Sequence, residues 1–397
     1  MLFFARQSLS IPPRLIKTRV LAGSLIFGGA LVLQPALNSD GAFVPVAAAQ
    51  ATTPANFDIF KPNPVNKSRF DYSIWNEALE QVVLDFGPST RLRAGRVRAG
   101  VGSRFVKGHK SAYRLEGSRF TFEFITDDYR QSLSDYRLDL QNLANDHDIT
   151  KFPKDEQLAY WINLHNVAVL EKIAENYPVD RPERIKLRVG GTKYKLDDAP
   201  FLQVMGQDIS LSDIRKNIVY SNWNDPSVIY GFFRGDIGSP SLSPYAYTGG
   251  DVTLMLSQNA DDFVNSLRGF NLGSKTRNVS AIYEEAAPYY FQNWDVDLTA
   301  HLAKYAGEEA AADLAKPYPF RIDTYDTMIA DLSGGERLGS SGAPTGNDGL
   351  SFETQRLLNE VRKKREYLIR RDVIGRKKGY VIIEDLVPEE DKQDPVE

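Results

Sequence analysis

The polar residues best placed to do chemistry fall in two stretches, an apolar helical segment and a loop rich in Gly, Ser and Pro. The first stretch, residues 155–178, carries Asn163, His165 and Asn166 among apolar neighbours. A helix that is apolar on nearly every side belongs inside a domain, and a buried amide without a partner costs on the order of 1 to 3 kcal/mol. These side chains therefore either hold neighbouring backbone or line a pocket.

The second stretch is the loop of residues 234–247. It follows an apolar run, Val228–Phe233, whose length and composition predict a buried strand. A loop behind a buried strand is a common place for a site, so we expect a ligand-binding pocket where this loop meets the helix. The candidate residues are Trp161, Asn163, His165, Asn166, Arg234, Asp236 and Ser239.

The spacing of these residues indicates different roles. Asn163 and Asn166 share one helix face, whereas His165 points elsewhere by roughly 100° to 200°. We interpret the two asparagines as ties to the loop's backbone and His165 as a satisfied core histidine that acts apart from them. Arg234 either binds a ligand carboxylate or phosphate through its planar fork, or pairs with Asp236 or a buried carboxylate.

Ser239 lacks the sequence context of a nucleophile, and no catalytic residue is assigned. A serine nucleophile requires a base within reach and an oxyanion site, yet no Gly-x-Ser-x-Gly elbow occurs and none of the four histidines has motif spacing to Ser239. The chain has no cysteine, which excludes a disulfide framework, a thiolate zinc site and thiol catalysis. Because metal-ligand patterns are also missing, we expect neither a metal nor another cofactor.

The first 49 residues have the three-part pattern of a secretory signal peptide. Four basic residues precede the apolar run Val20–Leu33, and Ala47–Ala49 stand before Gln50. The apolar run is about 14 residues long, shorter than the roughly 20 of a spanning helix; a retained membrane anchor is the alternative. We expect cleavage after Ala49, a periplasmic or extracellular protein, and no transmembrane helix in the mature chain.

Composition and periodicity predict one folded domain with extensions. The core is expected to be an α+β fold, a mostly helical single domain around a small, largely antiparallel sheet, with a flexible C-terminal extension. Helices are expected at 73–86, 127–143, 155–178, 251–267 and 297–314, and a hairpin at 184–196. The expected segments are a signal peptide (1–49), a linker (50–69), the core (70–332), a Gly/Ser-rich linker (333–350), and a basic helix with an acidic tail (351–397).

Charge is unevenly spread along the chain, whose net charge is −4. Two stretches, Arg91–Arg119 and Arg356–Lys378, are strongly basic. Outside the cytoplasm their partners would be anionic lipid surfaces or acidic glycans, and nucleic acid is not expected there. The alternative is that these stretches are solvated faces, the second neutralised by the acidic tail.

Three motifs together resemble the family of domains of unknown function numbered 547. They are AYWINLHN at 159–166, ISLSDI at 209–214, and the segment from Asp225-Pro226 through SPSL at 239–242 to Ala246-Tyr247. The stretch ADDFVN at 260–265 and the pair Tyr325-Asp326 also fit, so the resemblance covers about residues 132–332. What it implies is the domain, without an activity.

The chain departs from the family pattern where reactive residues are usual. Family members commonly carry a histidine where Ile229 stands, cysteines where Arg234 and Ser239 stand, and a tyrosine at the position of His165. If those cysteines and that histidine serve thiol chemistry, this chain cannot perform it.

Three functions remain open from the sequence. The first is an exported protein that binds a small or polymeric ligand of the cell envelope. The second is a hydrolase or transferase acting on envelope peptide or glycan, with Ser239 in the cysteine's place or with a polar pocket and no covalent step. The third is a scaffold whose basic stretches meet partners.

Overall fold

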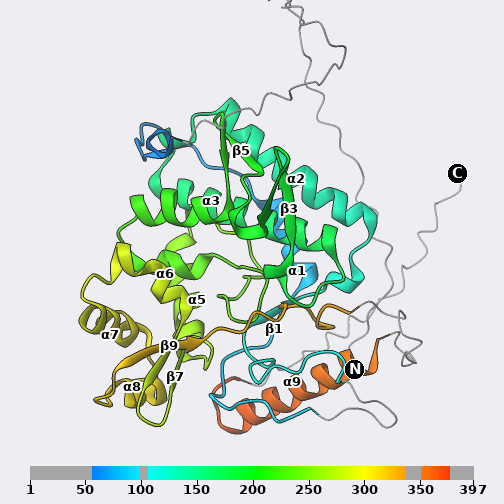
Figure 1. Ribbon diagram of the computed structural model, residues 1–397, viewed down its shortest axis with the longest axis vertical. Coiled ribbons are helices and arrows are strands. Elements are labelled where there is room, and N and C mark those ends of the chain that lie inside the picture. The colour runs from blue at the N-terminus through cyan, green and yellow to red at the C-terminus, as the bar shows by residue number, and fades with distance from the viewer. Residues whose placement is uncertain (1–55, 98–105, 337–349, 376–397) are drawn as a thin grey trace, which may run out of the picture. The chain divides into compact units, whose positions relative to one another are not determined.

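The structure, a computed structural model, describes residues 56–97, 106–336 and 350–375 (Figure 1). The predicted signal peptide and the acidic tail lie outside these ranges and stay predictions. Within them, no helix is long and apolar enough to cross a membrane.

The described residues form an α+β fold in which helices predominate, as predicted. The helices are α1 (Ser73–Val82), α2 (Asp127–Asp146), α3 (Lys154–Asn176), α4 (Leu211–Asp213), α5 (Val252–Asn265), α6 (Ala281–Tyr290), α7 (Trp294–Tyr305), α8 (Glu308–Leu314) and α9 (Phe352–Arg370). Single-turn 3-10 elements are η1 (Phe57–Phe60), η2 (Phe122–Phe124), η3 (Ile149–Lys151), η4 (Pro182–Arg184) and η5 (Leu196–Asp198), and a π-helical segment, η6 (Ile214–Tyr220), continues α4.

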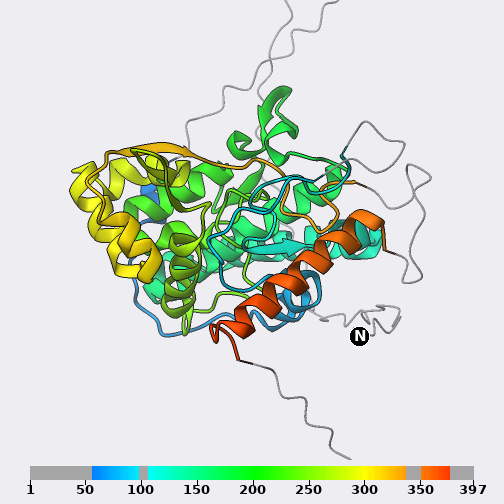
Figure 2. The same cartoon turned by 90° about the horizontal axis from the view of Figure 1, so that it is seen from below.

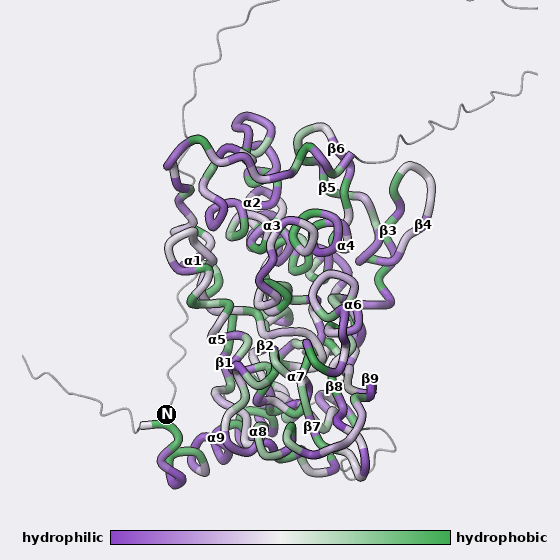
Figure 3. Tube along the Cα trace, turned by 90° about the vertical axis from the view of Figure 1, so that its left-hand side faces the viewer, coloured by the Kyte–Doolittle hydropathy of each residue, from purple (hydrophilic) through white to green (hydrophobic). Residues whose placement is uncertain are grey.

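The strands are short and pair mostly antiparallel. Instead of one small sheet, the described part of the chain contains three two-stranded sheets, β1-β2, β3-β4 and β5-β6, and one three-stranded sheet ordered β7-β8-β9, in which only β8 and β9 run parallel. The β3–β4 hairpin projects from its surroundings in Figure 3, in agreement with its mostly exposed residues. The strands are β1 (Val83–Asp85), β2 (Ser118–Phe120), β3 (Lys186–Val189), β4 (Thr192–Lys195), β5 (Leu202–Val204), β6 (Gln207–Ile209), β7 (Phe270–Leu272), β8 (Arg277–Ser280) and β9 (Phe320–Thr324).

Helix α3 is the buried helix that the sequence predicts. It begins after Pro153 and has Asp155 and Glu156 in its first turn, where negative charge stabilises a helix. Nearly all of its residues from Glu156 to Ala174 are buried, and α2 packs along it. In Figure 1 it lies above α5 and α6, and α5 contacts it. Because α3 has no solvent face, its polar side chains must find partners inside the domain.

Three secondary-structure predictions were wrong. The helix expected at 73–86 ends at Val82, and Val83–Asp85 form the strand β1. The run Val228–Phe233 is not a strand, because residues 226–231 form a 3-10 helix, η7 (Pro226–Gly231). Asp225 caps this element by accepting a hydrogen bond from the Ser227 N–H at 2.9 Å, and Pro226 fits the first helical position because its ring fixes φ. The single helix expected at 297–314 is two helices, α7 and α8, since Ala306 and Gly307 between them are extended.

The C-terminal helix α9 packs against the domain. Figure 2 shows α9, in orange to red, passing the strand β2, and Leu357 is buried in a small apolar cluster with Phe86 and Leu332. Residues 333–336, predicted as the start of a linker, are fixed by hydrogen bonds: the Gly335 N–H donates to Asp331 at 2.9 Å, and Ser333 is buried. The remainder of that predicted linker, 337–349, is outside the described residues.

Candidate functional site

The two asparagines of α3 hold both ends of the stretch 231–247. Asn163 donates to the Tyr247 carbonyl at 2.7 Å and accepts from the Tyr247 N–H at 3.1 Å. Asn166 donates to the Gly231 carbonyl at 3.0 Å and accepts from the Phe233 N–H at 3.1 Å. Both side chains are buried. An amide both donates and accepts, so each asparagine pairs with one backbone carbonyl and one backbone N–H of this stretch.

Glycines allow the loop to lie close to its neighbours. Gly235 has φ +88°, a conformation that disfavours other residues, and a Cβ there would collide with the side chain of Ile173 in α3. A Cβ at Gly238 would lie 2.6 Å from the backbone nitrogen of Asp326. The loop is therefore pressed between α3 and the segment around Asp326.

His165 joins the site, contrary to the sequence expectation that it acts apart. Its Nδ1 lies 3.1 Å from the Asn166 side-chain oxygen, and its Nε2 lies 3.0 Å from Nη1 of Arg215. A guanidinium only donates, so Nε2 is the acceptor and Nδ1 carries the proton. Burial, assisted by the charge of Arg215, lowers the pKa of His165 to about 3. The imidazole is neutral at physiological pH and links Asn166 to Arg215.

Arg215 is the centre of a buried ionic network that the sequence interpretation missed. Its side chain is fully buried and makes a two-point ion pair with Asp197, at 2.7 and 2.6 Å. On its other side Nε donates to Glu285 at 3.1 Å. The sequence does contain one sign of this network: Arg215 lies among the apolar residues of Ile214–Tyr220, and a buried charge must be paired. No local signal identified its partners.

Arg234 completes the network through the same glutamate. Its Nη2 and Nη1 donate to the two oxygens of Glu285 at 2.7 and 3.2 Å. The sequence left open whether Arg234 pairs with a buried carboxylate. In the structure it does so, and the carboxylate is that of Glu285. Burial raises the pKa of Glu285, but the positive charges of Arg215 and Arg234 outweigh it and lower the pKa to about 2. Glu285 is therefore ionised across the physiological range and is shared by two guanidinium groups.

Ser239 closes a tight turn beside Arg234. Its hydroxyl donates to the Asp236 carbonyl at 2.8 Å and accepts from the Arg234 N–H at 3.2 Å, and its own N–H donates to the Asp236 carboxylate at 2.9 Å. The residue is fully buried. Its contacts do not include His165, whose partners are Asn166 and Arg215. Ser239 therefore lies next to Arg234 and Asp236. Among the described residues, no histidine forms a hydrogen bond with it.

Asp236 is a buried carboxyl group with a displaced pKa. Burial raises its pKa to about 7, although the charge of Arg234 and hydrogen bonds from Tyr325 and Ser239 oppose the rise. Near neutral pH this carboxyl group is therefore divided between its charged and neutral forms. A buried carboxyl group poised in this way is capable of proton transfer.

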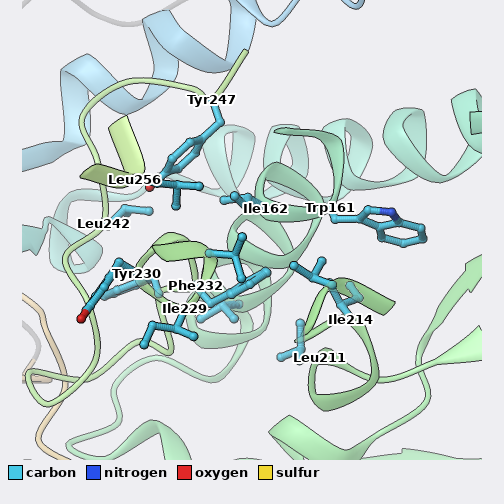
Figure 4. Close-up of a cluster of buried hydrophobic side chains, with 14 of the residues drawn as sticks. Trp161, Ile162, Leu211, Ile214, Ile229, Tyr230, Phe232, Leu242, Tyr247 and Leu256 are labelled. Atoms are coloured by element: carbon cyan, nitrogen blue, oxygen red, sulfur yellow. The ribbon is translucent and has the colours of Figure 1, made fainter. Parts of the chain in front are cut away.

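Trp161 belongs to the hydrophobic core and not to the polar network. Its ring packs edge-on against Phe60 at 5.2 Å and against Tyr160 at 5.1 Å between ring centres. Figure 4 shows Trp161 directed away from Tyr230 and Tyr247. Trp161 lies two positions before Asn163, and positions two apart on a helix face different ways.

The two basic stretches pack against each other, and several of their cations are buried. Arg114 and Arg119 of the first stretch are buried, as is Lys364 of the second. Lys364 donates to the carbonyls of Gly87 and Leu115 at 3.1 and 2.7 Å. These cations satisfy backbone carbonyl groups and a glutamate inside the domain, so they are not available to an anionic partner.

No group of three or more His, Asp or Glu residues that could hold a metal ion occurs in residues 56–97, 106–336 and 350–375. Two of the cavities in the described part of the chain have volumes of about 470 and 360 Å³, and neither of these two is lined by a residue of the predicted site. The first lies beside Arg91 and Asp313, and the second beside Glu123 and Tyr177.

The fold and the site define an α+β domain built on a buried helix that holds a glycine-dependent loop and a charge network. The model of the family described as "Protein of unknown function, DUF547" matches residues 149–264, from η3 to within α5. The chain therefore contains a DUF547 family domain, and the resemblance seen in the sequence is confirmed over that range. No curated protein and no solved structure matches the chain significantly.

Proposed function

We propose that this chain is an exported protein of the cell envelope that binds an anionic ligand, a small molecule or a group on a polymer, at Arg234. The proposal of export rests on the three-part pattern of residues 1–49. The proposal of binding rests on one observation: Arg234 reaches the solvent with 18% of its side chain exposed, above a buried network that already fixes its position.

The charges around Arg234 favour an anion. Arg215, Lys216 and Arg234 supply three positive charges against the two negative charges of Asp197 and Glu285. His165 adds none, because its pKa is lowered to about 3. Asp236 lies in the same loop as Arg234, and burial raises its pKa to about 7. A carboxylate or phosphate would balance the remaining positive charge.

The geometry suits recognition more than covalent chemistry. A guanidinium group held by a carboxylate loses little conformational entropy when it binds a second anion, which favours affinity. Lys216 extends the positive edge, with 39% of its side chain exposed and its Nζ 3.9 Å from Glu285. The alternative of a hydrolase or transferase using Ser239 finds no support in the contacts of the Ser239 hydroxyl, whose hydrogen bonds are with Arg234 and Asp236.

Thermal denaturation of the full chain with anionic probes tests the proposal. The probes are inorganic phosphate, a peptidoglycan fragment with a free carboxylate, and an acidic glycan. Ligand that binds only the folded state stabilises it by about 2.7 kcal/mol at a hundredfold excess over its Kd. We expect at least one probe to raise the Tm of the wild type and of Arg188→Gln, an exposed arginine in β3.

Arg234→Gln should lose that rise, whereas Arg234→Lys, which keeps the charge, should retain part of it. Circular dichroism of each variant without probe establishes that it is folded. Binding at Arg234 is disproved if Arg234→Gln responds to the probes as the wild type does, or if no probe raises the Tm of the wild type.

A further inference from the structure

The cavity of about 360 Å³ beside Tyr177 is separate from the Arg234 network. It lies where the segment before α2 meets the end of α3. Its volume is within the range of small-molecule pockets, roughly 300 to 1,000 Å³. Its lining residues are Phe122, Glu123, Ile125, Asp127, Arg130, Ala174 and Tyr177.

Glu123 is the poorly satisfied acid in this wall. One of its oxygens accepts a long hydrogen bond, 3.4 Å, from the Thr354 hydroxyl of α9. The other oxygen, Oε2, is buried and has no hydrogen-bond partner in the part of the chain that the structure describes. A buried carboxylate normally accepts several hydrogen bonds, because burying one that is unsatisfied is costly.

A second buried acid, Asp331, accepts more hydrogen bonds than Glu123 does. It accepts hydrogen bonds from the Phe122 N–H at 3.1 Å, from the Ser333 hydroxyl at 2.7 Å and from the Gly335 N–H at 2.9 Å. Its partners are thus complete without a ligand. Burial, together with repulsion from Asp331, raises the pKa of Glu123 to about 7. A positive charge in the cavity would relieve this repulsion.

The remaining lining residues include a second acid, Asp127, and one base, Arg130. Asp127 supplies a second carboxylate, already paired with Arg130 at 2.6 Å, so the wall carries two acids against one base. The rings of Phe122 and Tyr177 are stacked with centres 6.0 Å apart, and the Tyr177 hydroxyl is bonded to the Glu336 carbonyl at 2.7 Å.

We propose that this cavity binds a small organic cation, an alkylammonium group whose charge faces Glu123. A metal ion is a poorer fit, because the described residues gather no set of three metal ligands here or elsewhere. The site does not depend on the anion-binding function of Arg234, so either proposal can fail alone.

Titration of the full chain with n-butylammonium, followed by ligand-observed NMR, tests this site. Butyrate, which has a similar size and the opposite charge, is the matched probe. We expect butylammonium to bind and butyrate not to bind. Glu123→Gln should weaken butylammonium binding at least tenfold, since the glutamine keeps an acceptor for Thr354 but carries no charge. Glu77→Gln, an exposed glutamate in α1, should bind as the wild type does.

A second variant leaves Glu123 in place and fills the cavity. Ile125 is half-buried in the cavity wall, so Ile125→Lys would place a tethered ammonium group beside Glu123 and compete with the probe. Butylammonium binding should be lost in this variant while its Tm stays at or above that of the wild type. The proposal is overturned if the wild type does not bind butylammonium, if it binds butyrate equally well, or if both cavity variants bind as the wild type does.

Discussion

Arg114 and Glu360, which lie 246 residues apart in the sequence, form a two-point ion pair, with Nε to Oε2 at 2.6 Å and Nη2 to Oε1 at 3.0 Å. Arg114 is buried, and 27% of the Glu360 side chain is exposed. The same guanidinium donates to the carbonyls of Ser111 and Gly95 at 3.0 and 2.9 Å. This pair fixes α9 to the first basic stretch.

Removing the carboxylate of Glu360 should loosen α9. Glu360→Ala leaves the buried charge of Arg114 uncompensated, and we expect the free energy of unfolding to fall by on the order of 3 kcal/mol. Hydrogen exchange of the α9 amides should rise more than that of α3. Glu366→Ala, an exposed acid in the same helix, is the control and should change stability little. Equal effects of the two substitutions would show that the pair does not hold α9.

Asn166 should be more important for stability than its size suggests. In Asn166→Ala the Gly231 carbonyl, the Phe233 N–H and Nδ1 of His165 all lose a partner. Each unsatisfied buried group costs about 1 to 3 kcal/mol, so urea denaturation should show a loss on the order of 3 kcal/mol. Asn176→Ala, at the exposed end of α3, removes only a bond to the Lys172 carbonyl in its own helix. A similar loss in both variants would contradict the proposed backbone tie.

Asp236 should make stability depend on pH. Burial raises its folded pKa from the usual 3.8 to about 7, against the opposing charge of Arg234 and hydrogen bonds from Tyr325 and Ser239. Between these two values the folded protein binds the proton more tightly than the unfolded chain does. The contribution of Asp236 is therefore greatest below about pH 4 and is lost as pH rises to about 7, by roughly 1.4 kcal/mol for each pKa unit.

The measurement is urea denaturation of the wild type and Asp236→Asn from pH 4 to pH 8. The asparagine is uncharged throughout, so the stability of the variant relative to the wild type should increase up to about pH 7 and then level off. A difference that stays constant across this range would show that Asp236 titrates normally in the folded protein.

Features fixed by local patterns were predicted well from the sequence. The turn Gly190-Gly191 has positive φ at both residues and joins β3 to β4 as expected. Ser210 and Asp213 form a capping box, a motif of four consecutive residues. The burial of α3 follows from apolar side chains on nearly every side of the helix. The three-residue spacing of Asn163 and Asn166 places both on one face. In each case the deciding interactions lie within a few residues of one another.

The partners of the charged groups were decided only by the tertiary structure. Arg215 meets Asp197 and Glu285, and Arg234 meets Glu285, from separate elements whose approach no local pattern specifies. The same holds for Arg114 and Glu360. The sequence by itself determined that this is an α+β chain with a buried, mostly apolar helix and no cysteine chemistry. The packing of distant segments decides which acid each arginine pairs with and which arginine reaches solvent. The reason is that burial and Coulomb interactions act through space and not along the chain.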